Sequence, residues 1–258
     1  MRYDRAWAIG FWTLTWREVG RFLSLWKQTV FPPILSSLLY ILIFGEALGS
    51  RIRLIDGQPY TAYILPGLAM MGVMTSAYAN SSSSLFVAKL EQYINDVLIA
   101  PLSYWEIVLA YTAGAMLRGL LVGVLILGVG VIMADLPIAH WGMVIAFLLI
   151  VSALMSCAGL IMALWAESWD HVMLLLNFVI TPLVFLGGVF YSVNMLPPFW
   201  RSLSLVNPIF YMINGLRYGV LGVADASPAG SLALSALLAM AAFGLTVHLF
   251  RKGYRLKA

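Results

Sequence analysis

The composition of the chain is that of a membrane protein. It has 258 residues, of which 62% are hydrophobic and only 10% are charged, whereas a soluble domain carries roughly 45 to 50% apolar and about 25% charged residues. The 15 basic residues outnumber the 11 acidic ones, but they gather near both ends and form no stripe, which excludes a nucleic-acid-binding protein. The single cysteine, Cys157, excludes an internal disulfide framework.

Six segments are apolar and long enough to cross a bilayer core of roughly 30 Å, for which a helix needs about 20 residues. We expect them at residues 29–48, 63–86, 107–133, 142–165, 172–190 and 231–250. The chain, 1–258, is then one all-α transmembrane domain, in which 29–250 hold the spans and 251–258 form a short tail.

The distribution of basic residues predicts the orientation. An even number of spans puts both termini on one side, and that side carries ten Lys and Arg residues in its flanks. The opposite side carries four, namely Arg51, Arg53, Arg201 and Arg217. Because basic residues favour the cytoplasmic side, we expect cytoplasmic termini. Tryptophans also fall at predicted span ends, where indole rings prefer to lie: Trp105, Trp141, Trp165 and Trp169.

Residues 1–28 precede the first span, and the stretch from Gly10 to Gln28 has the pattern of an amphipathic helix. Its apolar face holds Trp12, Trp16, Val19, Leu23 and Trp26. Its polar face includes two arginines, Arg17 and Arg21. This pattern predicts a helix in the cytoplasmic headgroup layer, with its cations toward anionic lipid. Such a helix is either only a lipid anchor or a part of gating or partner docking.

The connection between spans two and three, residues 88–105, predicts a second amphipathic helix. Apolar residues repeat there at helical spacing, namely Leu90, Ile94, Val97 and Leu98. Polar residues lie opposite, namely Glu91, Gln92, Asn95 and Asp96. A helix of this kind lies on the membrane, or its acidic face fits a groove on a cytoplasmic partner. Periodicity alone does not choose between the two.

Residues 191–223 carry too few charges for a free aqueous loop and too many prolines for a straight span. Asn207 followed by Pro208 is a helix-start signal, so we predict two short helices at 198–205 and 208–221. Irregular backbone at membrane depth needs cover from protein. We therefore expect a re-entrant helical hairpin that enters from the outer face, with aromatic residues that form an interfacial belt or a gate.

The sequence lacks the motifs of enzymatic chemistry. No Gly-Lys dipeptide occurs, so the chain has no phosphate-binding loop with which to hydrolyse ATP. Its three histidines, His140, His171 and His248, lie far apart near span ends, which argues against a metal site. The serines at 81–84 have no neighbouring glycine, which argues against an intramembrane serine protease.

Polar groups inside spans are costly and are candidates for function, although many only pack helices together. Residues 80–84 of span two form a small-residue face or line a substrate path. Arg118 lies halfway along span three and must face the bundle or water. Glu46 lies about 15 Å from it in depth, too far for a direct pair. Pro182 and two following glycines make span five breakable.

Several local motifs accompany this order of parts. They are Leu98-Ile-Ala-Pro-Leu-Ser103, Thr181-Pro-Leu-Val-Phe-Leu-Gly-Gly-Val-Phe190, Leu196-Pro-Pro-Phe-Trp200, Asn207-Pro208 and Leu216-Arg217-Tyr218. Together with the N-terminal helix and six spans, they resemble the ABC-2 family of ABC transporter permeases, and most closely its bacterial inner-membrane members. The resemblance covers nearly the whole chain, and the proline-rich hairpin is its most specific part.

The resemblance implies a type V exporter-like permease subunit, which is not itself an enzyme. It would pair with a second permease copy and with two separate ABC ATPase subunits, which would bind ATP and Mg, so that this chain needs no cofactor. The segment at 88–102 would be the coupling helix, with contacts at Glu91, Ile94, Asn95, Asp96 and Leu98. The substrate pathway would use Asn80, Ser84, Asn177, Pro182 and Phe185. An outer gate would use Phe190, Trp200, Phe210 and Tyr211.

Two other classes of membrane protein stay open. An ion-coupled secondary transporter would show internal repeats and ionisable residues near mid-membrane, where only Arg118 lies. A nucleotide-independent lipid scramblase or a scaffold would have a similar composition. Membrane lipids are expected partners in each case, and the sequence does not predict the substrate.

Overall fold

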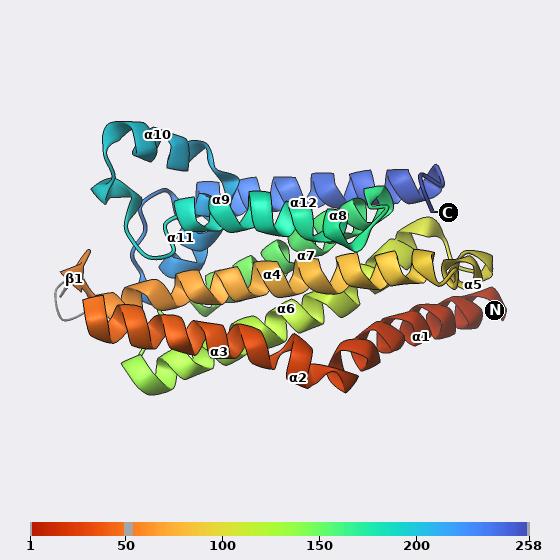
Figure 1. Cartoon of the computed structure of the whole chain (residues 1–258), viewed down its shortest axis with the longest axis horizontal. Coiled ribbons are helices and arrows are strands. Elements are labelled where there is room, and N and C mark those ends of the chain that lie inside the picture. Colours follow the sequence, from red (N-terminus) through yellow and green to blue (C-terminus); the bar gives the residue numbers. More distant parts are fainter. Residues whose placement is uncertain (1, 49–53, 257–258) are drawn as a thin grey trace.

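The computed structural model describes residues 2–48 and 54–256. Six of its helical segments are long and apolar enough to cross a membrane: Trp26–Gly45, Tyr60–Leu90, Tyr104–Ala134, Trp141–Trp165, Trp169–Leu186 and Pro228–Arg251. They lie along a common long axis (Figure 1). The prediction of six spans in an all-α membrane protein is confirmed, with boundaries that differ by a few residues. The four tryptophans expected at span ends lie there and are exposed.

Both chain ends lie at one end of the bundle, beside the short helix α5 (Ile94–Ile99), as an even number of spans requires (Figure 1). We call this the α5 end. The strand β1 (Leu54–Ile55) and helix α10 (Pro198–Val206) lie at the opposite end, the α10 end.

The N-terminal region is helical from α1 (Arg2–Ser24) through α2 (Trp26–Thr29) and α3 (Phe31–Tyr40) to a π-helical stretch, η1 (Ile41–Leu48). The amphipathic helix expected at 10–28 is present, but it starts earlier and breaks at Leu25. Prolines at the first positions of α3 explain a new helix start there, because proline lacks the amide hydrogen that a continuing helix would use.

A two-strand hairpin, which the sequence analysis did not predict, precedes the second span. Strand β1 pairs antiparallel with β2 (Gln58–Pro59). Its turn residues, Asp56 and Gly57, have φ angles of 49° and 77°, the left-handed geometry that tight hairpin turns require.

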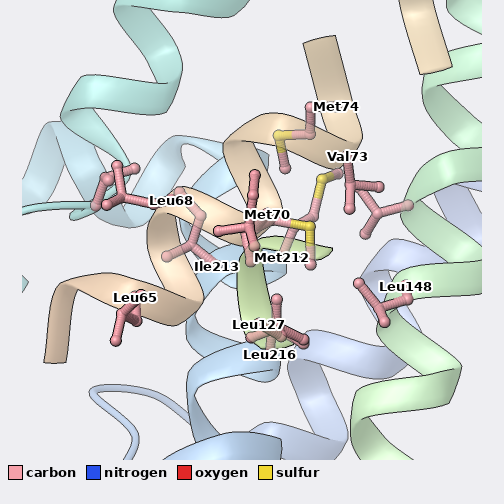
Figure 2. Close-up of a cluster of buried hydrophobic side chains, with 14 of the residues drawn as sticks. Leu65, Leu68, Met70, Val73, Met74, Leu127, Leu148, Met212, Ile213 and Leu216 are labelled. Atoms are coloured by element: carbon pink, nitrogen blue, oxygen red, sulfur yellow. The ribbon is translucent and has the colours of Figure 1, made fainter. Parts of the chain in front are cut away.

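Helix α4 (Tyr60–Leu90) runs through the centre of the bundle, and most of its residues are buried. It packs against α6 (Tyr104–Ala134), α7 (Trp141–Trp165) and α11 (Pro208–Leu221). Figure 2 shows where side chains from these four helices meet. The labelled residues are Leu65, Leu68, Met70, Val73, Met74, Leu127, Leu148, Met212, Ile213 and Leu216. This apolar core fixes α4 as the helix around which the others are arranged.

The helix expected at 88–105 is much shorter in the structure. Helix α4 continues to Leu90, and Gln92 then adopts a φ of 62°, a conformation that ends a helix. Helix α5 follows with six residues. A capping box between Ser103 and Glu106 starts α6, and it satisfies amide groups at that helix end.

The fifth span is helical throughout but changes its hydrogen-bonding pattern before Pro182. It consists of α8 (Trp169–Leu174), a π-helical stretch η2 (Leu175–Ile180) and α9 (Thr181–Leu186). The span ends at Leu186, not at residue 190 as expected. Gly188 has a φ of 80°, which only glycine adopts readily, so the chain turns there.

The predicted pair of short helices after this turn is confirmed. After a single 3-10 turn, η3 (Val193–Met195), the chain forms α10 and then α11. The side chain of Asn207 accepts a hydrogen bond from the Ile209 amide at 3.0 Å, which is the N-cap that Asn-Pro indicated. Helix α11 is buried against α4, α7 and α12 (Pro228–Arg251).

Candidate functional site

A buried polar cluster joins α1 to the bundle near the α5 end. Three residues of α1 meet polar side chains of α4 and α6, and we call this group the α1 cluster. Its members are Arg17, Glu18, Arg21, Asn80, Ser83, Ser84 and Tyr111. Helix α1 lies close against α6 there, because a Cβ added at Gly114 would lie 2.4 Å from the Cβ of Glu18.

Glu18 is the acidic centre of the α1 cluster, and it is 1% exposed. It accepts a hydrogen bond from the Ser84 hydroxyl. Its two oxygens lie 3.0 Å from Arg17 Nη2 and 3.6 Å from Arg21 Nε. A buried carboxylate is stabilised only by such partners. Because both arginines belong to α1 as well, the bond from Ser84 is the contact that joins Glu18 to α4.

Arg17 connects α1 with both α6 and the segment before α5. Its Nη2 donates to the Tyr111 hydroxyl at 3.1 Å, and its guanidinium lies 5.1 Å from the centroid of the Tyr93 ring. Burial lowers the pKa of Arg17, but Tyr111 and Glu18 raise it, and the net pKa lies above its ordinary value. Burial raises the pKa of the Tyr93 phenol. Both groups therefore keep their protons at neutral pH.

Arg21 extends the α1 cluster toward the middle of the bundle. Its Nη2 donates to the backbone carbonyl of Asn80 at 2.8 Å and to the side-chain oxygen at 3.0 Å, and its Nη1 donates to Ser83 at 3.3 Å.

Further along, Arg118 faces the bundle as expected and donates to the Thr29 carbonyl at 3.0 Å, where α2 ends. Glu46 has its side chain outside the part of the chain that the structure describes.

The cations of α1 make protein contacts that the sequence did not predict. Arg17 and Arg21 bind groups of α4 and α6 and lie near Tyr93, while both side chains stay partly exposed. Their orientation toward lipid stays a prediction. The tryptophan face is exposed as expected, with Trp12 64% and Trp16 70% exposed.

The predicted coupling residues lie at the α5 end. Ile94, the first residue of α5, is buried, and Leu98 is half-buried. Glu91, Asn95 and Asp96 are exposed. Two apolar side chains are exposed there. Leu90, which was expected on the apolar face of the helix, is 70% exposed, and Ile99, which was not singled out, is 80% exposed.

Lys89 anchors this segment from behind. Its Nζ donates to the carbonyls of Ala163 and Leu164 at 2.9 Å each and of Ala166 at 3.4 Å. These are the last carbonyls of α7, where a cation is favoured. Arg255 of the C-terminal tail donates to the Trp165 carbonyl at 2.9 Å.

The five predicted pathway residues fall into two groups. Asn80 and Ser84 are fully buried beneath α1, as members of the α1 cluster. Asn177, Pro182 and Phe185 are exposed on the fifth span. The structure therefore does not bring the two groups together within one chain.

The four predicted gate residues do not form a single group. Phe190 stacks on Phe44 and Phe185, with centroid distances of 4.7 and 5.8 Å, and so joins the far ends of spans one and five. Trp200 is exposed on α10, whereas Phe210 is buried and pairs with the half-buried Tyr211 at 5.0 Å.

The sequence analysis missed Arg217 as a structural residue. It is 1% exposed, and its Nη2 donates to the Gly188 carbonyl. It missed Asp225 as well, which accepts hydrogen bonds from the Ser192 hydroxyl at 2.7 Å and the Val193 amide at 3.1 Å. The position of Arg217 among the apolar residues of 209–221 was the sequence signal that could have indicated a buried, structural arginine. Within residues 2–48 and 54–256, no three His, Cys, Asp or Glu side chains gather as a metal site would require.

Comparison with known proteins defines the class of this membrane protein. The model of the ABC-2 type transporter family matches residues 9–221. The chain therefore belongs to the ABC-2 type transporter family. It is a multi-pass membrane permease in a family whose members are not themselves enzymes.

Among similar proteins is the inner membrane transport permease YadH of Escherichia coli K12, which is 44% identical over 209 residues, covering 81% of this chain and 82% of YadH. The nodulation protein J of Rhizobium leguminosarum bv. viciae is 27% identical over 220 residues, or 82% of each chain. The nodulation protein J of Sinorhizobium fredii NGR234 is 27% identical over 252 residues, or 93% of each.

Proposed function

We propose that this chain is the transmembrane subunit of an ATP-driven ABC exporter in the bacterial inner membrane. Two copies of the permease form the substrate pathway, and two separate ABC ATPase subunits, which bind ATP and Mg, drive it. Family membership and the name of YadH support this assignment. The α5 end is cytoplasmic in this proposal, in agreement with the excess of basic residues there.

The observation that carries the proposal is the mixed surface around α5. Glu91 and Asp96 are exposed beside the outward-facing Leu90 and Ile99, and a surface with both apolar and charged side chains suits a protein groove better than a free loop. Lys89, near the end of α4, binds the end of α7. A movement of α5 would therefore be transmitted to both α4 and α7.

Uncovered polar groups support the second permease copy. Asn177 is exposed in the middle of span five, next to Phe178, which is 77% exposed. A free amide is costly against lipid, so a protein surface or a water-filled pathway is the better neighbour. In the dimer, spans one and five of the two copies face each other, and the buried Asn80 and Ser84 line the pathway only if α1 moves.

The partner ATPase is identified first, by asking whether the reading frame next to the permease gene encodes an ABC ATPase. The decisive experiment then reverses the acidic charges at α5. The double variant Glu91→Lys, Asp96→Lys is expected to lose this ATPase on purification or to uncouple ATP hydrolysis from transport. Asp170→Lys is the matched control, because Asp170 is also exposed at the α5 end. Normal assembly and transport by the double variant would show that α5 is only a surface helix.

Orientation and energy source have independent tests. A reporter that is active only in the cytoplasm should be active when fused after Ala258, and activity of a periplasm-only reporter there would reverse the topology. Transport that continues without nucleotide would favour a scramblase, whereas transport driven by an ion gradient would favour a secondary transporter.

A further inference from the structure

A groove of about 450 Å³ lies on the polar face of α1, between this helix and the segment that leads into α5. Its lining residues are Arg17, Gly20, Arg21, Ser24, Tyr93 and Asp96. Two partly exposed guanidinium groups therefore share one opening, with hydroxyl groups beside them. Guanidinium groups bind phosphate oxygens through paired hydrogen bonds.

The charge balance around the groove favours an anion. Among the residues that line the groove, Arg17 and Arg21 bring two positive charges and Asp96 brings one negative charge. The lining therefore carries one more cation than anion.

Hydrogen-bond donors are also in excess. Three buried donor atoms have no acceptor among the described residues: Arg21 Nε, Arg118 Nε and Asn80 Nδ2. Asn80 is fully buried and Arg118 is 9% exposed. Of these three residues only Arg21 lines the groove, and its Nε lies 3.6 Å from a Glu18 oxygen. Asn80 and Arg118 lie outside the lining and do not contact a ligand bound there.

The depth of the groove indicates a ligand that resides in the membrane. The exposed Trp12 and Trp16 on the opposite face of α1 mark the interfacial layer. Asn80, which Arg21 contacts, lies ten residues before the end of α4, or about 15 Å along the helix. The groove, lined by residues 17–24 of α1 and by Tyr93 and Asp96, therefore lies at the depth of the headgroup layer, within reach of a lipid headgroup.

We propose that this groove binds the phosphate headgroup of an anionic lipid from the leaflet around the α5 end, with Arg17 and Arg21 as its main contacts. Arg118, deeper in the bundle, adds to the positive potential. The inference rests on the proposed function only for its assignment of this leaflet to the cytoplasmic side. It adds a lipid-binding site to the permease, whatever molecule the exporter carries.

The test compares lipids that differ in charge. The purified full-length protein in detergent is titrated with phosphatidylglycerol or phosphatidylcholine, and bound lipid is counted by native mass spectrometry. We expect phosphatidylglycerol to bind about tenfold more tightly. Gly20→Leu should abolish this preference, because a Cβ at Gly20 meets nothing within 4 Å, so the larger side chain fills the groove in the folded protein. Arg21→Gln should weaken the preference in the same direction.

The control variant is Arg201→Gln, which removes an exposed arginine at the α10 end and should leave the preference unchanged. Equal binding of both lipids, or a preference that survives Gly20→Leu, would overturn the proposal. Displacement of phosphatidylglycerol by equimolar inorganic phosphate would reject a lipid as the source of the anion. Loss of the ATPase from Gly20→Leu with intact lipid preference would make the groove a protein contact. Lipid binding is measured without ATPase, so its failure leaves the proposed function standing.

Discussion

The guanidinium group of Arg217 lies over the ring of Tyr63, with 4.1 Å from its central carbon to the ring centroid. Arg217 belongs to α11 and Tyr63 to α4, and both are buried. The Nε and Nη1 atoms of Arg217 have no hydrogen-bond partner among the described residues. The aromatic face therefore supplies an important part of the stabilisation of this buried cation. The contact fixes α11 to α4 beside Gly188, where span five ends.

Removing the ring at Tyr63 should destabilise the protein more than removing its hydroxyl. Tyr63→Leu is expected to lower the free energy of unfolding by about 2 kcal/mol, the value of a desolvated cation–π contact. Tyr63→Phe should cost clearly less, because the hydroxyl lies near Ser192 without a hydrogen bond of ordinary geometry. Thermal unfolding in detergent measures both. Equal losses would show that the hydroxyl, not the ring, stabilises Arg217.

Neutralising Glu18 should release α1. Glu18→Gln leaves Arg17 and Arg21 without their carboxylate. Because both arginine side chains are partly exposed, we expect a loss of about 1 to 3 kcal/mol. The matched control is Glu167→Gln, which removes an exposed pair with Arg255 at 3.0 Å and should cost less than about 1 kcal/mol. Protease cleavage within residues 8–24 reports the release. Similar resistance of both variants would contradict a structural role of Glu18.

A methyl group at Gly114 should also displace α1. The new Cβ would lie 2.4 Å from the Cβ of Glu18, and overpacking of this kind costs about 1 to 3 kcal/mol. Gly128→Ala on the same helix is the control, since a Cβ there meets nothing within 4 Å and alanine favours a helix by about 0.5 to 1 kcal/mol. Unfolding midpoints that move in opposite directions are expected. A stabilised Gly114→Ala variant would mean that α1 is not held closely against α6.

Cysteines on span five should crosslink across the proposed dimer. In a Cys157→Ala background, Asn177→Cys or Phe185→Cys is expected to form a disulfide with its symmetry mate or to react with a polar thiol reagent. Ile145→Cys on α7 is the control, because Ile145 is 53% exposed on a face that we assign to lipid. If only Ile145→Cys reacted, our assignment of span five to the dimer centre would be wrong.

The sequence predicted the helices better than the contacts between them. Hydropathy located all six spans, and Asn207 with Pro208 located the start of α11 within one residue, because span length and proline chemistry are local constraints. The protein contacts of Arg17 and Arg21 were not predicted, because an amphipathic pattern does not tell which neighbour lies against its polar face. Glu18 alone, an acid within a basic helix face, gave a clue that this neighbour was protein.

Partners of buried polar residues were hidden for the same reason. Asn80 and Ser84 were identified as polar groups inside a span, but their contacts come from α1, about sixty residues earlier in the chain. The pairing of Arg217 with Tyr63 spans an even longer separation in sequence. Periodicity describes one helix at a time, so contacts between distant helices can be identified only from the three-dimensional structure.

The hydrogen bonds of Lys89 have a mechanical consequence. Because Lys89 and Arg255 bind the terminal carbonyls of α7, this helix end has fixed partners from two distant parts of the chain. We therefore expect a displacement of α5 to move α4 and α7 together. The neighbouring fifth span contains the π-helical stretch η2, and such stretches are frequent at functional sites, so we expect this span to bend there. Opening would start there, not in the core.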